Sequence, residues 1–179
     1  MEKTEGNMLK KIAVTGPECS GKTTLCKALS SHYQCFWVPE MARIILEKDG
    51  FSYNARNVED MARMQLKEEQ RMEKSALNSG HEWLFCDTDL LVYQVWMEVR
   101  FGFCPDWIME EIGRADYAHR LLLRPDLPWE DDGLRENALN RDELFERYRI
   151  ILLESSNKWS IIEGEKRLED TKCILIKIL

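Results

Sequence analysis

Short apolar runs alternate with longer amphipathic stretches along this chain, and that alternation predicts its fold. Five runs rich in apolar and β-branched residues predict buried strands, at residues 11–15, 35–38, 83–86, 118–123 and 159–162. Apolar positions at helical spacing predict helices at residues 23–32, 40–48, 57–78, 90–99, 105–114, 141–155 and 167–179. Strands that alternate with helices favour a parallel sheet covered on both faces, so we expect an α/β fold with five parallel strands.

Composition narrows the class of protein. The 179 residues suffice for one domain, and we expect residues 1–9 to form a flexible leader before a domain over residues 10–179. The net charge of −7 argues against nucleic acid as a partner, because a phosphate backbone favours a basic surface. The apolar runs are too short to cross a bilayer, and six cysteines without a C-x-x-C pair are typical of reduced thiols. We therefore expect a cytoplasmic protein without a membrane partner, and its oligomeric state stays open.

The turn after the first predicted strand carries a phosphate-binding motif. It reads G-x-x-x-x-G-K-[ST] and comprises Gly16, Pro17, Glu18, Cys19, Ser20, Gly21, Lys22 and Thr23, followed by Thr24. A strand before the motif and a helix after it are the context of a P-loop, whose backbone N–H groups surround a phosphate at a helix N-terminus. Lys22 is expected to reach the β- and γ-phosphates, and the Thr23 hydroxyl to hold Mg²⁺. The motif therefore predicts ATP and Mg²⁺ as cofactors.

Carboxylates follow two of the other predicted strands. Because ligands of parallel sheets bind outside the carboxyl ends of the strands, Glu40, Asp87 and Asp89 should converge with the P-loop and with Arg124. Asp87 is a candidate for the Mg²⁺ side of the site or for catalysis, and the alternative is a helix N-cap. Glu40 is a candidate for the base that accepts a substrate hydroxyl's proton, and the alternative is a charge that complements a helix dipole. Asp89 is a candidate for substrate binding.

Further candidates for the acceptor site lie on the predicted helices. Arg43 follows Glu40 by one turn, so it could bind an anion or pair with that carboxylate. Gln65 carries an amide that could read the edge of a base or a carboxamide. Three aromatic residues near the expected crevice could stack on a flat ring, although the third is more typical of core packing: Trp37, Tyr93 and Trp96.

The irregular, proline- and acid-rich segment after the fourth predicted strand is expected to be a lid, at about residues 124–141. Phosphoryl transfer requires positive charge on the transferred group and exclusion of water, so Arg135 and Arg141 are candidate catalytic residues. Trp129 and Asp132 are candidates for the acceptor pocket. Arg147 and Arg149 lie near acidic residues on the following helix and favour surface ion pairs.

Four segments together resemble one family. They are the P-loop at residues 16–24, V-P-E-M-A-R at 38–43, F-C-D-T-D at 85–89 and P-D-L-P-W-E-D-D-G-L-R at 125–135. In that order, over about residues 11–167, they resemble the ribosylnicotinamide kinase domain of NadR-type proteins and the related NadR-like P-loop ATPases. The resemblance implies a nucleoside-kinase-like fold and ATP- and Mg²⁺-dependent phosphorylation of the 5′-hydroxyl of nicotinamide riboside. It also places the chain near deoxynucleoside kinases, in which a Glu at the position of Glu40 is the base.

The chain departs from NadR-type proteins in two respects. The adenylyltransferase and DNA-binding domains of those proteins have no counterpart here, so we expect a stand-alone kinase without a repressor role. Some members place an aromatic residue beside the Glu, where it can stack on nicotinamide, and here that position is Pro39. There are two alternatives. The acceptor could be another nucleoside or nucleotide, or the chain could be a regulatory ATPase in which hydrolysis drives a conformational change.

Overall fold

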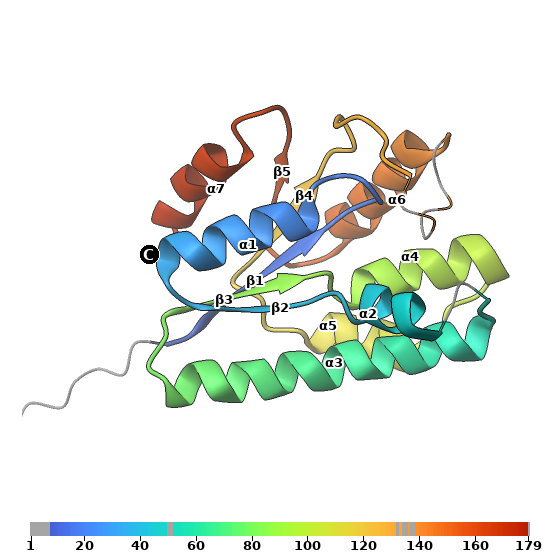
Figure 1. Ribbon diagram of the computed structural model, residues 1–179, viewed down its shortest axis with the longest axis horizontal. Helices are drawn as coiled ribbons and strands as arrows, with labels where there is room; N and C mark the ends of the chain where they lie inside the picture. The colour runs from blue at the N-terminus through green and yellow to red at the C-terminus, as the bar shows by residue number, and fades with distance from the viewer. Residues whose placement is uncertain (1–7, 50–51, 132, 134–135, 137–138, 179) are drawn as a thin grey trace, which may run out of the picture.

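The computed structural model describes residues 8–49, 52–131, 133, 136 and 139–178, and strands alternate with helices throughout (Figure 1). Most of the predicted leader therefore lies outside the described residues. The elements are β1 (Lys10–Thr15), α1 (Lys22–Tyr33), β2 (Phe36–Val38), α2 (Met41–Asp49), α3 (Ala55–Asn78), β3 (Trp83–Asp87), α4 (Leu90–Phe101), α5 (Asp106–Arg114), β4 (His119–Leu123), α6 (Arg141–Glu154), β5 (Trp159–Ile162) and α7 (Arg167–Ile176). None of the described helices is both long and apolar enough to span a membrane.

The five strands form one sheet in the order β2-β3-β1-β4-β5, and every neighbouring pair is parallel. Side chains on β1 alternate between two packed layers. Ile12 and Val14 pack on one face with residues of α1 and α7, whereas Ala13 packs on the other with Cys86 and with Met72 of α3. Figure 1 shows α1 and α7 on one side of the sheet and α3 with α5 on the other. The predicted parallel α/β fold is therefore confirmed.

Element boundaries follow local chemistry that the apolar pattern does not report. Helix α3 begins two residues before its predicted start because Asn54 and Asn57 form a capping box, in which each side chain accepts a hydrogen bond from the other's backbone N–H. Helix α4 continues past its predicted end and stops at Gly102, whose φ of 77° is readily adopted only without a Cβ atom. The predicted types of all elements match the structure, and their limits differ by up to a few residues.

The order of the strands brings the candidate residues to one edge of the sheet. Strand β3 lies between β2 and β1, with Val38 opposite Cys86 and Val14 opposite Asp87. The segments that follow β1 and β2, together with the end of β3, therefore meet at adjacent positions. This edge holds the P-loop, Glu40 and Asp87.

Candidate active site

The P-loop curls around the side chain of its own lysine. Lys22 is buried, and its ammonium group donates hydrogen bonds of 2.9 Å to the carbonyl oxygens of Gly16 and Pro17. These bonds use two of the three N–H donors of an ammonium group, and the third can serve a phosphate oxygen. Ser20 Oγ donates to the Pro17 carbonyl at 2.8 Å, and Cys19 adopts a positive φ of 55°. The loop thus has the turned-in backbone of an anion-binding nest.

Gly16 is required by the close approach of β4. An added Cβ atom would lie 2.7 Å from the Leu123 carbonyl oxygen, and the φ of Gly16 is +133°. Both the backbone contact and the dihedral angle oppose any other residue at this position. The glycine therefore sets how closely the P-loop follows the sheet.

We expect Gly16→Ala to lower the free energy of unfolding by about 1–3 kcal/mol, because the new methyl group meets backbone that cannot move aside cheaply. Urea unfolding measures the change. Gly113→Ala is the matched control, since Gly113 lies in helix α5 and an added Cβ atom would meet no described atom within 4 Å. The control should be neutral or stabilising by up to about 1 kcal/mol. Equal losses in the two variants would contradict the steric argument.

A cavity of about 210 Å³ extends from the P-loop toward helices α2 and α4. The P-loop from Gly16 to Thr24 lines one end, and Glu40 and Arg43 lie on the wall beside it. Arg43 Nε lies 3.8 Å from Glu40 Oε2, so pairing, one of the two roles considered for Arg43, is present in the structure. The remaining wall is largely apolar and aromatic, with the charged side chains of Arg100 and Glu136 among the described residues, and it includes Tyr53, Val92, Val95, Trp96 and Tyr148.

Asp87 lies beneath the P-loop at the end of β3 and is only 1% exposed. Its two carboxylate oxygens have no hydrogen-bond partner among the residues that the structure describes. Burial, followed by the charge of Glu40, raises the pKa of Asp87 from 3.8 to about 6. The nearby Thr23 hydroxyl and the cationic Lys22 lower it, although Thr23 does not meet the geometry of a hydrogen bond. A buried carboxylate with free oxygens beside a P-loop threonine has the donor set that Mg²⁺ prefers.

The raised pKa of Asp87 predicts a pH-dependent effect of Asp87→Asn on stability. Between about pH 4 and pH 7 the folded protein holds a proton that the unfolded chain has lost, so this group lowers stability as the pH rises. An amide cannot ionise. We therefore expect the variant's unfolding free energy, relative to wild type, to rise by about 2 kcal/mol between pH 4 and pH 8 without Mg²⁺. Denaturant titrations at each pH measure this difference, and a difference independent of pH would contradict it.

Two predicted substrate-binding residues lie away from the cavity. Asp89 is 1% exposed and forms an ion pair with the buried Arg120, whose Nε donates to Asp89 Oδ2 at 2.9 Å. Gln65 is equally buried, and its amide bonds to backbone groups near Glu40. Among the described residues, neither of them lines the cavity. In this structure their side chains therefore bind protein groups beneath the site, and they do not occupy the predicted position against an acceptor.

Described parts of the expected lid pack over the P-loop. An added Cβ atom on Gly21 would lie 3.0 Å from Leu127 Cδ1, and the Glu130 backbone N–H donates to Cys19 Sγ at 3.2 Å. Arg141 donates to the Leu127 carbonyl at 3.0 Å and lies 5.5 Å from the ring centre of Trp129. Neither Arg141 nor Trp129 lines the cavity among the described residues, so a role for them requires movement of this segment. The candidates Asp132 and Arg135 lie outside the described residues.

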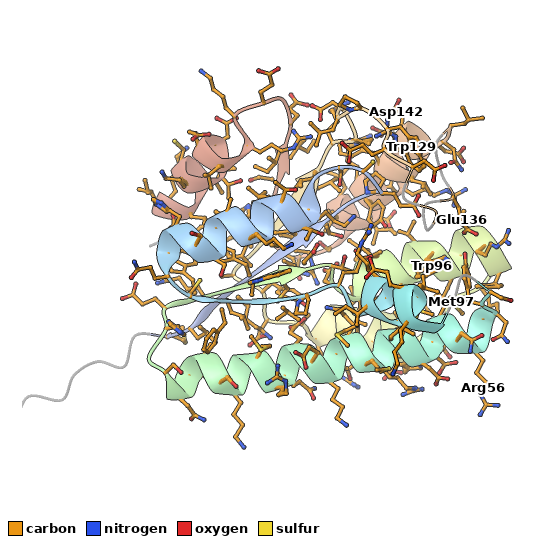
Figure 2. All side chains as sticks on the ribbon, viewed as in Figure 1. Arg56, Trp96, Met97, Trp129, Glu136 and Asp142 are labelled. Atoms are coloured by element: carbon orange, nitrogen blue, oxygen red, sulfur yellow. The ribbon has the colours of Figure 1, made fainter. Side chains whose placement is uncertain are left out.

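The aromatic end of the cavity was only partly predicted. Trp96 packs against the core as expected, but it also lines the cavity, and its Nε1 donates to the Tyr53 hydroxyl at 3.1 Å. Tyr53 in turn donates to Glu136. Figure 2 shows Trp96 and Glu136 near each other beside α4. Tyr93 is fully buried behind this wall, whereas Trp37 packs against the core on the α1 side of the sheet. Tyr53 follows α2 in an irregular segment without helical or strand periodicity, which explains why the sequence pattern did not indicate it.

Two arginines predicted to form surface ion pairs do so, whereas Arg124 does not reach the cavity. Arg147 and Arg149 form exposed ion pairs with Glu143 and Glu146 on their own helix, as predicted. Arg124 pairs with Glu163 and lies over the Phe145 ring, so it is not brought to the cavity in the described structure. The site therefore comprises the P-loop, Glu40, Arg43, Asp87 and the aromatic wall.

A parallel five-stranded sheet with a P-loop after its central strand is a P-loop fold, and solved nucleoside and nucleotide kinases share it. The family described as an AAA domain matches residues 11–169, and the chain belongs to that family.

Solved structures show the same fold. A crystal structure of NadR protein in complex with NR superposes with a TM-score of 0.78 at 24% identity, over 95% of this chain and 51% of the other. NadR in complex with NAD and AMP-PNP has a TM-score of 0.74 at 21% identity, over 95% of this chain and 49% of the other. The chain thus spans about half the length of these NadR proteins. A deoxyadenosine kinase from M. mycoides, with dCMP and dCDP bound, has a TM-score of 0.63 at 14% identity, over 94% of this chain and 98% of the other. The expected likeness to NadR-type proteins is confirmed.

Proposed function

We propose that this protein is an ATP- and Mg²⁺-dependent small-molecule kinase whose acceptor is the 5′-hydroxyl of a nucleoside, with nicotinamide riboside as the first candidate. The observation that carries the proposal is that the P-loop and the Glu40 carboxylate open onto one cavity with an aromatic far wall. A phosphate donor and a flat acceptor can therefore approach each other within a single site.

The residues divide between the two halves of the reaction. The P-loop N–H groups and Lys22 bind the ATP phosphates, and Mg²⁺, when bound, would supply positive charge against them. Thr23 and Asp87 would hold the metal ion, because Asp87 offers two unpartnered oxygens among the described residues and lies next to Thr23. Glu40 is the base that removes the hydroxyl proton, since it lines the cavity whereas Asp87 is buried beneath the loop.

The acceptor pocket has the chemistry of a nucleoside site. Trp96 and Tyr53 offer ring surfaces for stacking in place of an aromatic residue at Pro39, and Arg43 can bind a ribose oxygen or an anion. The likeness to NadR in complex with NR supports a ribosylated pyridine, and the kinase relatives support nucleosides more widely. Product release and water exclusion would depend on the segment at about residues 124–141 acting as a lid.

The test is ADP release from ATP and Mg²⁺, first alone and then with a panel of nucleosides that includes nicotinamide riboside. Strong stimulation by nicotinamide riboside, with the mononucleotide as product, is the expected result. Stimulation by a different nucleoside would retain the mechanism and replace the substrate. Steady hydrolysis that no acceptor changes would overturn the kinase proposal and favour a regulatory ATPase.

A further inference from the structure

The buried amide of Gln65 in α3 binds the backbone on both sides of Glu40. Gln65 Oε1 accepts the Met41 backbone N–H at 2.8 Å, and Gln65 Nε2 donates to the Pro39 carbonyl oxygen at 3.2 Å. An amide has one end that accepts and one that donates, so these two partners define its orientation. The residue between them is Glu40. Its backbone is thus bound from outside its own segment, 24 to 26 residues along the chain.

The first N–H group of α2 needs a hydrogen-bond acceptor that the short β2–α2 junction does not provide. Met41 is the first residue of α2, and N–H groups in the first turn of a helix have no partner within that helix. The side-chain amide of Gln65 supplies that partner. With only Glu40 between the two bonded peptide groups, rotation of its backbone would break at least one bond. The direction in which the Glu40 side chain leaves the backbone therefore depends on Gln65.

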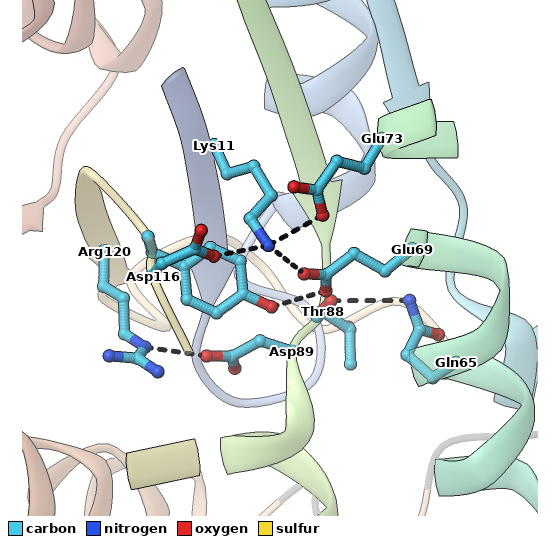
Figure 3. A network of polar contacts seen from close by, with 9 residues as sticks. Lys11, Gln65, Glu69, Glu73, Thr88, Asp89, Asp116 and Arg120 are labelled. Carbon is cyan, nitrogen blue, oxygen red and sulfur yellow. Dashed lines mark hydrogen bonds and ion pairs between the residues drawn. The ribbon is translucent and has the colours of Figure 1, made fainter. Parts of the chain in front are cut away.

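The same amide also contacts the tip of β3. Gln65 Nε2 lies 3.5 Å from the carbonyl oxygen of Thr88, the residue after Asp87, as the dashed line in Figure 3 marks. Thr88 has a positive φ of 78°, which is uncommon for a residue with a β-branched side chain. Its own N–H donates to the Val14 carbonyl oxygen of β1 at 3.1 Å, just before the P-loop. Gln65 therefore joins the ends of β2 and β3, and through Thr88 it is linked to β1.

We infer that Gln65 is a positioning residue that fixes Glu40 relative to Asp87 and the P-loop. The inference rests on the proposed kinase function and adds a residue that does not touch substrate. Gln65 is 1% exposed and lies outside the cavity, so its effect passes through the backbone that it binds. Its loss should act on the transfer step and spare ATP binding, because the Lys22 and P-loop contacts do not involve it.

Gln65→Met tests the inference, since it keeps an unbranched side chain of similar length and removes both hydrogen bonds. We expect kcat with the best nucleoside to fall about 10-fold or more, because small misplacement of a catalytic group is costly, and the KM for ATP to change less than about 2-fold. Burial favours the protonated carboxyl of Gln65→Glu, which retains an acceptor for the Met41 N–H and a donor for the Pro39 carbonyl oxygen. This variant should therefore lose less activity, and it also covers a failure of the first variant to fold. Gln70→Met, at an exposed position on the same helix, is the control and should match wild type.

Hydrogen exchange of the Met41 backbone amide gives a second readout that requires no turnover. The exchange should be faster in Gln65→Met than in wild type or Gln70→Met, because the amide loses its acceptor. Unchanged exchange would overturn the inferred contact, and faster exchange with wild-type kcat would overturn its positioning role. Equal losses in kcat and in ATP binding would show a general structural defect and overturn it as well. A wild-type protein that phosphorylates no nucleoside would instead overturn the proposed function, and this inference with it.

Discussion

Replacing Glu40 by glutamine should slow phosphoryl transfer by about 10²-fold or more, the usual effect of removing a general base. The carboxylate lines the cavity beside the P-loop, 3.8 Å from Arg43, so it is placed to take a proton from an acceptor hydroxyl. An amide of the same shape cannot take that proton. Single-turnover kinetics with ATP and Mg²⁺ in excess measure the transfer step directly. The affinity for ATP and the dependence on Mg²⁺ should stay close to those of wild type.

Glu47→Gln is the matched control for this variant. Glu47 lies on α2, the helix that follows Glu40, is largely exposed, and its Oε1 is also 3.8 Å from Arg43, at Nη1. If the loss in Glu40→Gln came only from releasing Arg43, the control would lose activity too. We expect it to keep wild-type rates. A transfer rate within about 10-fold of wild type in Glu40→Gln would contradict the assignment of Glu40 as the base.

Replacing Asp87 by asparagine should also reduce turnover about 10²-fold or more at limiting Mg²⁺, but by a different route. Asp87 is buried next to Thr23, and its loss removes negative charge from the side of the site where the metal ion is expected. The concentration of Mg²⁺ needed for half-maximal rate should therefore rise, and excess Mg²⁺ should restore part of the rate.

A Mg²⁺ titration of the initial rate separates the two carboxylates. In Glu40→Gln the half-saturating Mg²⁺ concentration should not change, whereas in Asp87→Asn it should increase. If Asp87→Asn lost its rate without any change in this concentration, Asp87 would be assigned to proton transfer in place of metal binding. That outcome would reverse the roles proposed for the two residues.

The parts of the site that lie on regular elements could be predicted from sequence. The P-loop spacing places Lys22 and Thr23, and the rule that ligands bind at the ends of parallel strands places Glu40 and Asp87. The predicted positions hold because strand order and chain direction decide where a backbone segment lies, whereas the roles of these residues stay predictions. Neither strand order nor chain direction depends on which rotamer a side chain adopts.

The predictions for Asp89 and Gln65 did not hold in the same way, because their partners come from elements distant in sequence. Asp89 follows a strand just as Asp87 does, but it faces Arg120 of β4, and the linear sequence does not indicate that pair. Gln65 was expected to read an acceptor, and its position against Pro39 and Met41 depends on how α3 packs. Trp96 packs against the core as expected and also lines the cavity, and helical spacing alone does not indicate that second contact.

The position of β1 in the middle of the sheet has a consequence for how this chain folds as it is synthesised. Strand β1 precedes both of its neighbours in the chain and must wait for them, since Lys10 pairs with Trp83 and Ile12 with His119. Until β4 has been translated, an edge of this apolar strand stays without its native partner, which favours pairing with other chains. Contacts so distant in sequence also slow folding. The sheet can therefore be completed only after β4 and β5 have been translated.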